Sequence, residues 1–568
     1  MNMLFKDVLW WSLGIVALVV LSIRILEILW AKLRQVSAMS VPREKQNYWK
    51  TSQWNWMPGM KKHLIYAPLL RKRHNRELRL SSALNVGTLP SRLHFVLLFF
   101  YLGSNIVYMF FLNWAVENKY KFCAELRGRS GTLAIVNMVP LIIMAGRNNP
   151  LIPLLKISFD TYNLLHRWMG RIVVAEVVIH TVAWAIPAVA DKGWKAFGAV
   201  LKSWFIGSGF WGGAAMVLIL ILSLSPLRHA FYETFLNVHI ILAIVAFGGT
   251  WIHCAAATPA LPQLPWIVAI VALWIADRVA RALRLVINNW SNRGFTDALC
   301  EALPGDVTRV TVYLPRYVRI KPGTHAYLRF SGILAWESHP FSVAWVDHYA
   351  TNALPQAEKE PLTGLDKSNA GTAVSFIIGA QTGMTRKLFE RACQSNKGIR
   401  LRAALEGPYA GHHNLDSYRH VVLFAGSTGI THQISHIRDL LEGYNDNRVA
   451  TRRLTLVWII RSYESLEWVR PFMDAVLRIP NRKDILRIQV FVTRPENPRD
   501  IVSASSTVKM FPGRPNVPLL LAKEVQDQIG AMVVTVCGPG GLADDVRGAV
   551  RRLQGDTVID FIEESFTW

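Results

Sequence analysis

The chain has 568 residues, of which 51% are hydrophobic and 21 are tryptophan, and its formal net charge is +24. This length allows two or three domains. Its five cysteines include no CxxC pair, which disfavours a zinc site, an iron–sulfur cluster and a disulfide framework.

Long apolar runs are confined to residues 1–290, whereas residues 291–568 show the shorter periods of strands and amphipathic helices. The third run is short and contains Pro140, so we expect it to be tilted or re-entrant. The N-terminus lacks the features of a removable signal, and its run is expected to remain as an anchor. The predicted membrane spans lie at 7–29, 93–114, 131–146, 162–189, 204–224, 233–254 and 264–286.

Residues 31–80 are strongly basic, with twelve Lys or Arg against two acidic residues, Glu44 and Glu77. This stretch lies between two apolar runs, a pattern typical of a cytoplasmic loop that contacts lipid headgroups. We prefer this interpretation to nucleic-acid binding, for which we recognise no motif, and we expect no nucleic-acid partner. With seven spans, the N-terminus would lie outside and the soluble half inside.

Two of the apolar runs carry histidines at the same spacing: HRWMGRIVVAEVVIH at 166–180 and HIILAIVAFGGTWIH at 239–253. Fourteen helical residues separate two side chains by roughly 21 Å along the axis and about 40° around it. Each helix therefore presents both of its imidazoles on one face, near opposite ends of a span.

Both of these helices would run from inside to outside, which pairs His166 with His239 at the inner level and His180 with His253 at the outer level. Facing imidazoles in a helical bundle are typical axial ligands of haem iron, and we expect two b-type haems. For a single such histidine, a hydrogen-bonded core residue or a proton relay is the alternative.

Three further polar residues of the first histidine helix have open roles. Arg167 and Arg171 would either neutralise haem propionates or reach toward lipid headgroups. Glu176 would either form a hydrogen bond between helices or belong to a proton path.

The soluble half begins with short β-segments over residues 295–345, ending in HPFSVAW. Farther along, apolar strands are followed by glycine turns and helical patterns, which predicts a doubly wound sheet with ligands at the carboxyl ends of its strands. The segments concerned are EGPYAG at 406–411, VVLFAGSTGITHQISHIRDLL at 421–441, LTLVWIIR at 454–461 and MVVTVCGPGGLADDVRGAV at 532–550.

The turn at 426–430, GSTGI, stands where a strand passes into a helix. Its backbone amides could hold a pyrophosphate, with an ordinary helix-opening turn as the alternative. Arg461 follows a later strand, where it would bind a ribose 2′-phosphate or remain a surface arginine.

The four histidines, HPFS, EGPY, CGPGG and the aromatic C-terminus FIEESFTW follow one another in an order that resembles the fungal ferric reductase family, within the superfamily of the NADPH oxidases. The resemblance covers most of the chain. It implies an α-helical transmembrane bundle of about seven helices and then a ferredoxin-reductase-like module, with an antiparallel β-barrel FAD domain and a doubly wound α/β NADPH domain. The expected parts are an N-terminal transmembrane helix at 1–30, a basic cytoplasmic loop at 31–92, a haem-binding core at 93–290, the FAD domain at 291–412 and the NADPH domain at 413–568.

The resemblance implies FAD, NADPH and two b-type haems as cofactors, and no catalytic residue apart from those that bind them. The inner iron ligands would be His166 and His239, and the outer ligands His180 and His253. The FAD residues would be His339, Pro340, Phe341, Ser342, Gly383, Thr385, Phe566 and Trp568, the last two as candidates to cover the isoalloxazine. The NADPH residues would be Gly426, Ser427, Thr428, Gly429, Ile430, Thr431, Arg461, Cys537, Gly538, Pro539 and Gly540, with Cys537 near the nicotinamide.

The expected activity is transfer of electrons from cytosolic NADPH through FAD and both haems to an acceptor outside the membrane. That acceptor would be Fe³⁺ or a ferric chelate, with Cu²⁺ as a further candidate. A superoxide-generating NADPH oxidase and a non-enzymatic membrane scaffold with a degenerate reductase fold are the alternatives. The expected partners are the lipid bilayer, these metal ions and an iron permease or oxidase system, and the expected location is the plasma membrane with the FAD/NADPH module in the cytosol.

Overall fold

A computed structural model describes residues 2–40, 42, 47–74, 89–292, 294–334, 336–350, 369–411, 413–497, 501–503, 505–555, 557 and 559–564. These residues form two compact units. The first holds the N-terminal residues up to Arg24 together with Pro68–Ala280. The second holds Ile25–Ala67 and the chain from Arg281 onward.

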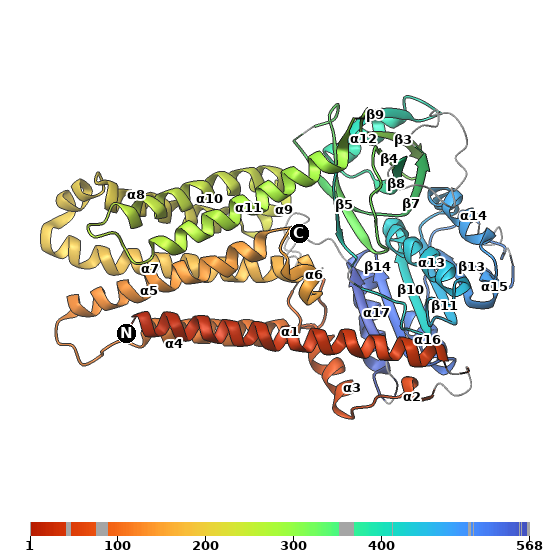
Figure 1. The fold of residues 1–568 in the computed structure, drawn as a ribbon, viewed down its shortest axis with the longest axis horizontal. Coiled ribbons are helices and arrows are strands. Elements are labelled where there is room, and N and C mark those ends of the chain that lie inside the picture. Colours follow the sequence, from red (N-terminus) through yellow and green to blue (C-terminus); the bar gives the residue numbers. More distant parts are fainter. Residues whose placement is uncertain are drawn as a thin grey trace. The chain divides into compact units, whose positions relative to one another are not determined.

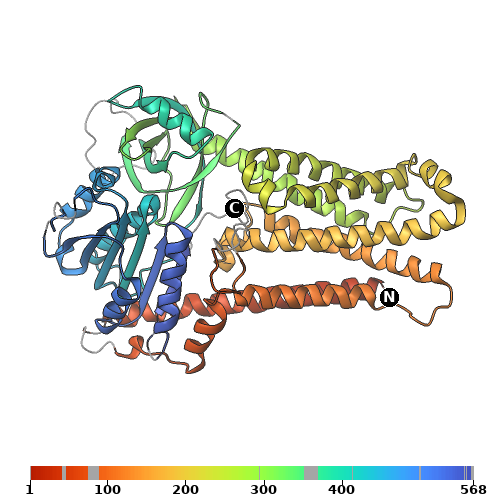
Figure 2. The same ribbon diagram turned by 180° about the vertical axis from the view of Figure 1, so that it is seen from behind.

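Long helices dominate the first unit, and α5, α7, α8 and α10 run side by side in both views (Figures 1 and 2). The long helices are α1 (Asn2–Ser40), α4 (Arg92–Phe110), α5 (Lys119–Ala145), α7 (Phe159–Val200), α8 (Trp204–Leu222), α10 (Tyr232–Ala255) and α11 (Leu264–Asn289). The short ones are α6 (Leu151–Leu155) and α9 (Ser225–Ala230). Ile135, Val173, Met216, Phe247 and Ile270 form a shared core from five of the long helices.

All seven expected spans are helical, which confirms the helical bundle. Within the described residues, six are long and apolar enough to cross a membrane, namely α1, α4, α5, α7, α8 and α10. The remaining helix, α11, carries Asp277, Arg278, Arg281 and Arg284 in its second half.

Side-chain caps explain where four of these helices begin. Ser91, Asn118, Ser158 and Ser203 precede α4, α5, α7 and α8, and each accepts a hydrogen bond from a backbone amide of the first turn. Such caps satisfy amide donors that have no partner within the helix.

The predicted limits of the third span, 131–146, were too narrow, and the prediction of a re-entrant segment was wrong. Helix α5 begins at Lys119 and continues through Pro140 as one helix of 27 residues. A prediction from apolar residues does not include the first turns of α5, because residues 119–130 are largely polar although they are helical. Arg129 is buried there beside Glu125, one turn earlier, with 3.3 Å between their charged groups.

The second unit contains a seven-stranded antiparallel sheet in the order β6-β5-β9-β3-β4-β8-β7. A short hairpin of β1 (Trp290–Ser291) and β2 (Gly294–Phe295) precedes it. The strands are β3 (Asp297–Leu303), β4 (Val307–Leu314), β5 (Thr324–Phe330), β6 (His339–Ser342), β7 (Trp345–Ala350), β8 (Ala370–Gly379) and β9 (Ile399–Ala410), with helix α12 (Met384–Ala392) after β8.

A six-stranded parallel sheet follows, in the order β13-β12-β11-β10-β14-β15. Its strands are β10 (His420–Gly426), β11 (Arg453–Ile460), β12 (Leu486–Val492), β13 (Val508–Pro512), β14 (Met532–Cys537) and β15 (Ile559–Glu564). Its helices are α13 (Ile430–Asn445), α14 (Arg470–Arg478), α15 (Arg482–Ile485), α16 (Val517–Gln526) and α17 (Gly540–Leu553), with 3₁₀ turns η4 (Ser427–Gly429) and η5 (Tyr463–Trp468).

The parallel sheet is buried on both faces. Helices α13 and α14 cover one face of this sheet and α16 and α17 the other (Figure 1). Their apolar side chains pack against the strands in two separate core clusters. Burial on both faces explains why its strands are continuous apolar runs. The strand order changes direction between β10 and β14, where sheets of this kind bind ligands. The expected doubly wound part is therefore confirmed.

Residues 25–67 differ from the expected basic loop, because the structure includes them in the second unit. They comprise the end of α1, α2 (Asn47–Lys50), α3 (Trp56–Met60) and a π-helical turn, η2 (Lys61–Ile65). Trp49 from this segment is buried in the core of the parallel sheet.

Candidate active site

The structure brings the four histidines together in the two expected pairs. On α7 and α10, the ring centroids of His166 and His239 lie 6.3 Å apart, with 67° between the ring planes. Those of His180 and His253 also lie 6.3 Å apart, at 84°. The two pairs therefore have the same separation at two levels of one helical bundle.

Backbone carbonyls orient three of these rings. A carbonyl oxygen can only accept, so each Nδ1 must carry the proton, which leaves the Nε2 lone pair available. The contacts are Leu141 O for His166 (3.0 Å), Arg127 O for His180 (2.9 Å) and Phe205 O for His253 (2.8 Å). Phe235 packs beside the fourth ring, His239, with the centroids 5.5 Å apart.

Glycines of neighbouring helices lie directly against the outer pair. A Cβ atom on Gly131 of α5 would lie 2.6 Å from Nδ1 of His180. One on Gly209 of α8 would lie 2.7 Å from Nδ1 of His253. Only glycine allows these helices to approach the two rings so closely.

Glu176 lies on α7 between the two levels and is fully buried. Asn137 of α5 donates to both of its carboxylate oxygens, at 2.9 and 3.1 Å. The Asn137 amide also donates to Asn105 and accepts from the Tyr101 hydroxyl, both on α4. These contacts favour the role of a hydrogen-bonding residue between helices, the first of the two considered above.

The expected flavin strand, HPFS, forms β6 at one end of the antiparallel sheet. Its neighbour β5 pairs on the other side with β9, which ends in the EGPY segment. His325 of β5 lies opposite Ser342 on one side and Tyr409 on the other. The sheet thus brings together two motifs that are more than sixty residues apart in sequence.

The start of α12 holds a negative charge. Gly383, with φ of 59°, precedes this helix, and the Glu337 carboxylate accepts the amide of Met384 at 2.9 Å. Glu337 also lies 3.3 Å from Nε2 of His339. The side chain of Thr385 is buried. Its hydroxyl accepts a hydrogen bond from the backbone amide of Gln381 and donates one to the carbonyl of Thr382, which closes the turn.

The end of α11 is joined to β9 by an ion pair. Arg281 donates to both oxygens of the fully buried Glu406, at 2.8 and 3.0 Å. The Tyr409 hydroxyl donates to the same carboxylate at 3.0 Å, and Asn288 donates to the carbonyl of Gly407 at 2.6 Å. These bonds hold the EGPY segment in place.

The two expected dinucleotide turns meet at the switch point between β10 and β14. A Cβ atom on Gly429 would clash with the Cys537 carbonyl, and one on Gly538 would lie 2.8 Å from the Gly426 nitrogen. Ser427 has a positive φ of 53°, and Trp458 of β11 donates to its carbonyl at 3.1 Å. The absence of side chains at these glycines leaves backbone amides close to whatever binds there.

The other expected residues of both turns lie at the carboxyl ends of the same strands. Thr428, Ile430 and Thr431 continue from β10 into α13, and Thr431 donates to the carbonyl of Thr428 at 2.8 Å. Pro539 and Gly540 open α17 after β14. Arg461 follows β11 directly and is exposed.

Cys537 ends β14 and lies opposite Glu564, the last residue of β15. Burial raises the pKa of the Cys537 thiol, and the carboxylate of Glu564 raises it further, so the thiol stays protonated. Phe566 and Trp568 lie outside the described residues.

Comparisons with known proteins match three segments of the chain. A family described as "Ferric reductase like transmembrane component" matches residues 130–250, a "FAD-binding domain" matches 293–363 and a "Ferric reductase NAD binding domain" matches 418–551. The chain is similar to the fungal ferric reductases. Its transmembrane, FAD-binding and NAD-binding parts are all represented.

Individual ferric reductases are similar over most of the chain. "Ferric reductase transmembrane component 3" of Saccharomyces cerevisiae is 28% identical over 85% of this chain and 68% of its own. "Ferric/cupric reductase transmembrane component 2" of the same yeast is 26% identical over the same shares. "Ferric/cupric reductase transmembrane component 1" of Candida albicans is 23% identical over 89% of this chain and 67% of its own. Together with the six apolar helices, these relatives indicate an integral membrane protein.

Three carboxylates at these sites were not predicted from the sequence. Glu337 stands two residues before HPFS, Glu406 begins EGPY and Glu564 lies in the C-terminal EES. Each lies within or beside a quoted motif, so position along the chain could have suggested them. Their partners could not be inferred, because they come from other elements.

Proposed function

We propose that this protein transfers electrons from NADPH through FAD and two b-type haems to Fe³⁺ or ferric chelates across a membrane. The observation that carries the proposal is the pair of histidine pairs on α7 and α10, each with ring centroids 6.3 Å apart. Electron transfer across most of a bilayer requires cofactors as redox centres, because protein side chains do not supply this one-electron chemistry.

The separation of the rings would allow each pair to hold one haem iron between its two imidazoles. A bond from a metal to an imidazole nitrogen is about 2.0 Å and the ring centre lies about 1.1 Å farther, so opposed rings would be roughly 6 Å apart. Within the described residues, no group of three or more His, Cys, Asp or Glu side chains could hold a metal ion. Two protein ligands at each site suit haem, because the porphyrin provides the other four. We assign His166 and His239 to the inner haem and His180 and His253 to the outer haem.

We assign the diphosphate of FAD to the start of α12, beside Gly383 and Thr385, because the amides of a helix N-terminus favour a negative charge. The Glu337 carboxylate accepts the amide of Met384 at this helix start, so it would have to move aside for the diphosphate. His339, Pro340, Phe341 and Ser342 would hold the flavin along β6. Phe566 and Trp568 remain candidates for covering its ring.

At the nucleotide edge, the glycine turns bind the diphosphate of NADPH through their amides, and Arg461 pairs with the 2′-phosphate. Cys537 and Glu564 stand at the nicotinamide end, where the buried thiol excludes water and stays protonated. Bound FAD would convert the two-electron hydride into the single electrons that haem accepts.

The names of the relatives support the acceptor, since they are called ferric or ferric/cupric reductases. Cu²⁺ is therefore a second acceptor to test. One relative, from Aspergillus oryzae, is named "Probable cell surface ferric reductase kap2", which supports the plasma membrane as the location. We place the FAD/NADPH module in the cytosol, where NADPH would be available. An iron permease or oxidase would then use the Fe²⁺ product. We keep the domain limits expected from the sequence as a proposal, with residues 31–67 added to the nucleotide domain.

The deciding experiment measures NADPH-dependent reduction of ferric and cupric chelates by membranes, with and without superoxide dismutase. Direct metal reduction is insensitive to the dismutase. Reduction that the dismutase abolishes would instead identify a superoxide-generating NADPH oxidase. A protein whose haem spectrum does not change on addition of NADPH would be a non-enzymatic scaffold.

A further inference from the structure

Strand β15 needs support that its own sheet does not provide. It is the last strand of the parallel sheet, and among the described strands it pairs only with β14. Its register places Asp560 opposite Val533 and, four residues later, Glu564 opposite Cys537. An edge strand has a free row of backbone groups, so something must cover it to fix its position.

The described part of residues 25–67, namely 25–40, 42 and 47–67, covers this edge, and we call it the N-terminal clasp. The Tyr66 hydroxyl accepts the amide of Phe561 at 3.1 Å, and the two rings pack with centroids 5.7 Å apart. Thr51 pairs with Thr557, just before β15, in an antiparallel bridge. The clasp therefore contacts β15 along the side that faces away from β14.

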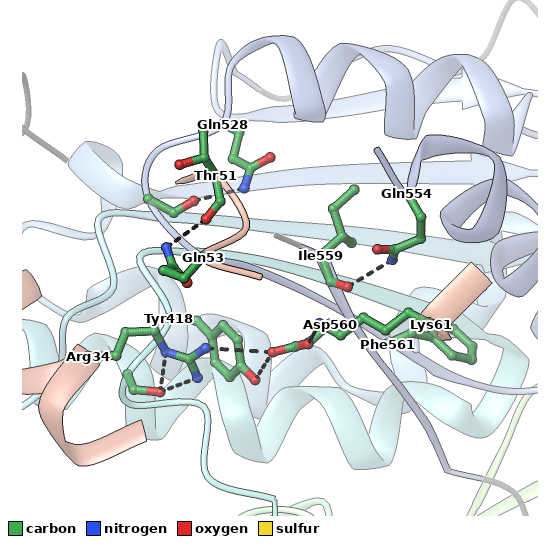
Figure 3. A network of polar contacts seen from close by, with 12 residues as sticks. Arg34, Thr51, Gln53, Lys61, Tyr418, Gln528, Gln554, Ile559, Asp560 and Phe561 are labelled. Atoms are coloured by element: carbon green, nitrogen blue, oxygen red, sulfur yellow. Dashed lines mark hydrogen bonds and ion pairs between the residues drawn. The ribbon is translucent and has the colours of Figure 1, made fainter. Parts of the chain in front are cut away.

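The strongest contacts of the clasp meet at Asp560 (Figure 3). Lys61 donates to one oxygen of this carboxylate at 2.5 Å. The Tyr418 hydroxyl donates to the other oxygen at 2.5 Å, and a guanidinium nitrogen of Arg34 lies 3.6 Å from it. Two cations of the clasp thus share one anion of β15.

Arg34 is also held by the nucleotide domain itself. Its guanidinium lies over the Tyr418 ring, 3.9 Å from the centroid, and donates to the Ser417 hydroxyl at 2.8 and 3.2 Å. The side chains of Arg34, Lys61 and Asp560 are only 8%, 14% and 23% exposed. Buried cations without an anion are costly, so Asp560 is the residue on which this arrangement depends.

Although burial alone would raise the pKa of Asp560, Lys61 and Arg34 hold it at about 2. The carboxylate is therefore charged at every pH at which the protein would work. The attachment is permanent, and it does not switch on and off near neutrality.

Further bonds show that the clasp belongs to the nucleotide domain. They are Arg419 to the carbonyl of Ala38 (2.6 Å), Gln35 to the carbonyl of Arg448 (2.9 Å) and Arg551 to the carbonyl of Lys62 (2.8 Å). Trp49 adds an apolar anchor, since it is buried in the core with Val421 and Leu441.

We propose that the N-terminal clasp holds β15 in register and so positions Glu564 beside Cys537 for hydride transfer from NADPH, with Asp560 as the positioning residue. This inference rests on the proposed function, because it assumes that nicotinamide binds at the Cys537–Glu564 edge. Asp560 itself lies four residues before Glu564, and its side chain contacts Arg34, Lys61 and Tyr418, none of which belongs to a nucleotide turn.

The test compares Asp560→Asn with the unaltered full-length protein in membranes or detergent. At saturating NADPH, we expect FAD reduction in a stopped-flow experiment to slow by about tenfold, because small misplacements of reacting groups cost large factors in rate. The KM for NADPH should change less than about twofold, since the diphosphate turns are intact. The isotope effect with NADPH deuterated at C4 should increase, and hydrogen exchange of residues 559–564 should become faster.

Glu524→Gln is the matched control. Glu524 is a more deeply buried carboxylate that, like Asp560, has two basic partners, His420 at 2.8 Å and Arg453 at 2.9 Å. It lies near the amino ends of β10 and β11, away from the nucleotide turns at their carboxyl ends. This variant should lose stability but keep the rate of FAD reduction and the exchange of β15.

Equal slowing in both variants, or unchanged exchange of β15 in Asp560→Asn, overturns the proposal. If Asp560→Asn does not fold, Lys61→Met removes the more exposed cation and should give the same changes to a smaller degree, with Lys61→Arg restoring them. If the unaltered protein does not reduce FAD with NADPH, the proposed function is wrong, and the exchange of β15 alone then decides whether the clasp holds the strand.

Discussion

Gly429 and Cys537 face each other backbone to backbone, where the turn after β10 meets the turn after β14. A Cβ atom on Gly429 would clash with the Cys537 carbonyl. Two turns more than one hundred residues apart in sequence therefore form one surface, and this closeness is possible only because Gly429 has no side chain.

Replacing Gly429 by alanine should force the two turns apart and weaken binding of NADPH at least tenfold. Overpacking of this kind typically costs about 1–3 kcal/mol. Gly548→Ala in α17 is the control, because a Cβ there would meet only the flexible end of Arg552, at 3.8 Å. Binding can be followed by quenching of tryptophan fluorescence. Equal affinities of the two variants would show that the turns do not form the nucleotide site.

Replacing His180 by alanine should remove about half of the b-type haem absorbance and abolish reduction of external acceptors, because one of the two proposed haem sites loses a ligand. His166→Ala should remove the other half. Pyridine haemochrome spectra of the purified proteins measure the haem content. Full haem content in either variant would contradict the pairing across α7 and α10.

Gly131→Ala should disturb the outer histidine pair, His180 and His253, without removing either of the proposed haem ligands. Its new methyl group would lie 2.6 Å from Nδ1 of His180, so the ring or α5 must move. We expect a shifted midpoint potential or altered low-temperature spectrum for one haem only. Gly103→Ala on α4 is the control, since nothing lies within 4 Å of a Cβ there. Unchanged spectra in both variants would mean that the contact does not orient the ring.

Arg461→Ala should raise the KM for NADPH by tenfold or more and leave that for NADH nearly unchanged. An arginine at this strand end can bind a 2′-phosphate through two hydrogen bonds, which NADH does not offer. Arg514 is an exposed arginine just after β13, two strands away, so Arg514→Ala should change neither value. Similar effects of Arg461→Ala on both nucleotides would rule out the role.

Acidification from pH 6.5 to 4 should destabilise the second unit through His432 and His436 of α13. Their ring centroids lie 5.1 Å apart, and both rings lie close to Gly323. His325 and His413 are also near His432. Burial lowers the pKa of both, that of His436 to about 4. The unfolded chain, with an ordinary histidine pKa near 6.5, binds protons first, so stability falls across this window by on the order of 3 kcal/mol for His436.

Thermal unfolding of the wild type and His436→Gln at pH 7 and pH 5 tests this expectation. The variant should lose less of its stability on acidification. Asp560 and Glu524 do not interfere, because their pKa values are held at about 2 and the stability that they contribute is lost only below about pH 4. Identical losses in both proteins would assign the acid sensitivity to other groups.

Local sequence was sufficient for features that depend on a repeating backbone geometry. The spacing of fourteen residues placed two histidines on one face of each helix, because an α-helix has a constant rotation per residue. Continuous apolar runs followed by glycine turns predicted the parallel sheet, because strands buried on both faces need no polar residues. The boundaries were less predictable, and α5 shows why, since its polar first turns are fixed by the Asn118 cap and the Glu125–Arg129 pair rather than by apolar content.

The sequence by itself determined which residues we propose for the redox chemistry of this protein and on which elements they lie. Only the tertiary structure decided which glycines press against the histidine rings, that Glu564 stands opposite Cys537, and that residues 25–67 cover β15. These relationships join segments up to five hundred residues apart. They arise from packing and from the pairing of partly buried charges, such as Lys61 with Asp560. Packing and charge pairing between distant segments do not follow from periodicity along the chain.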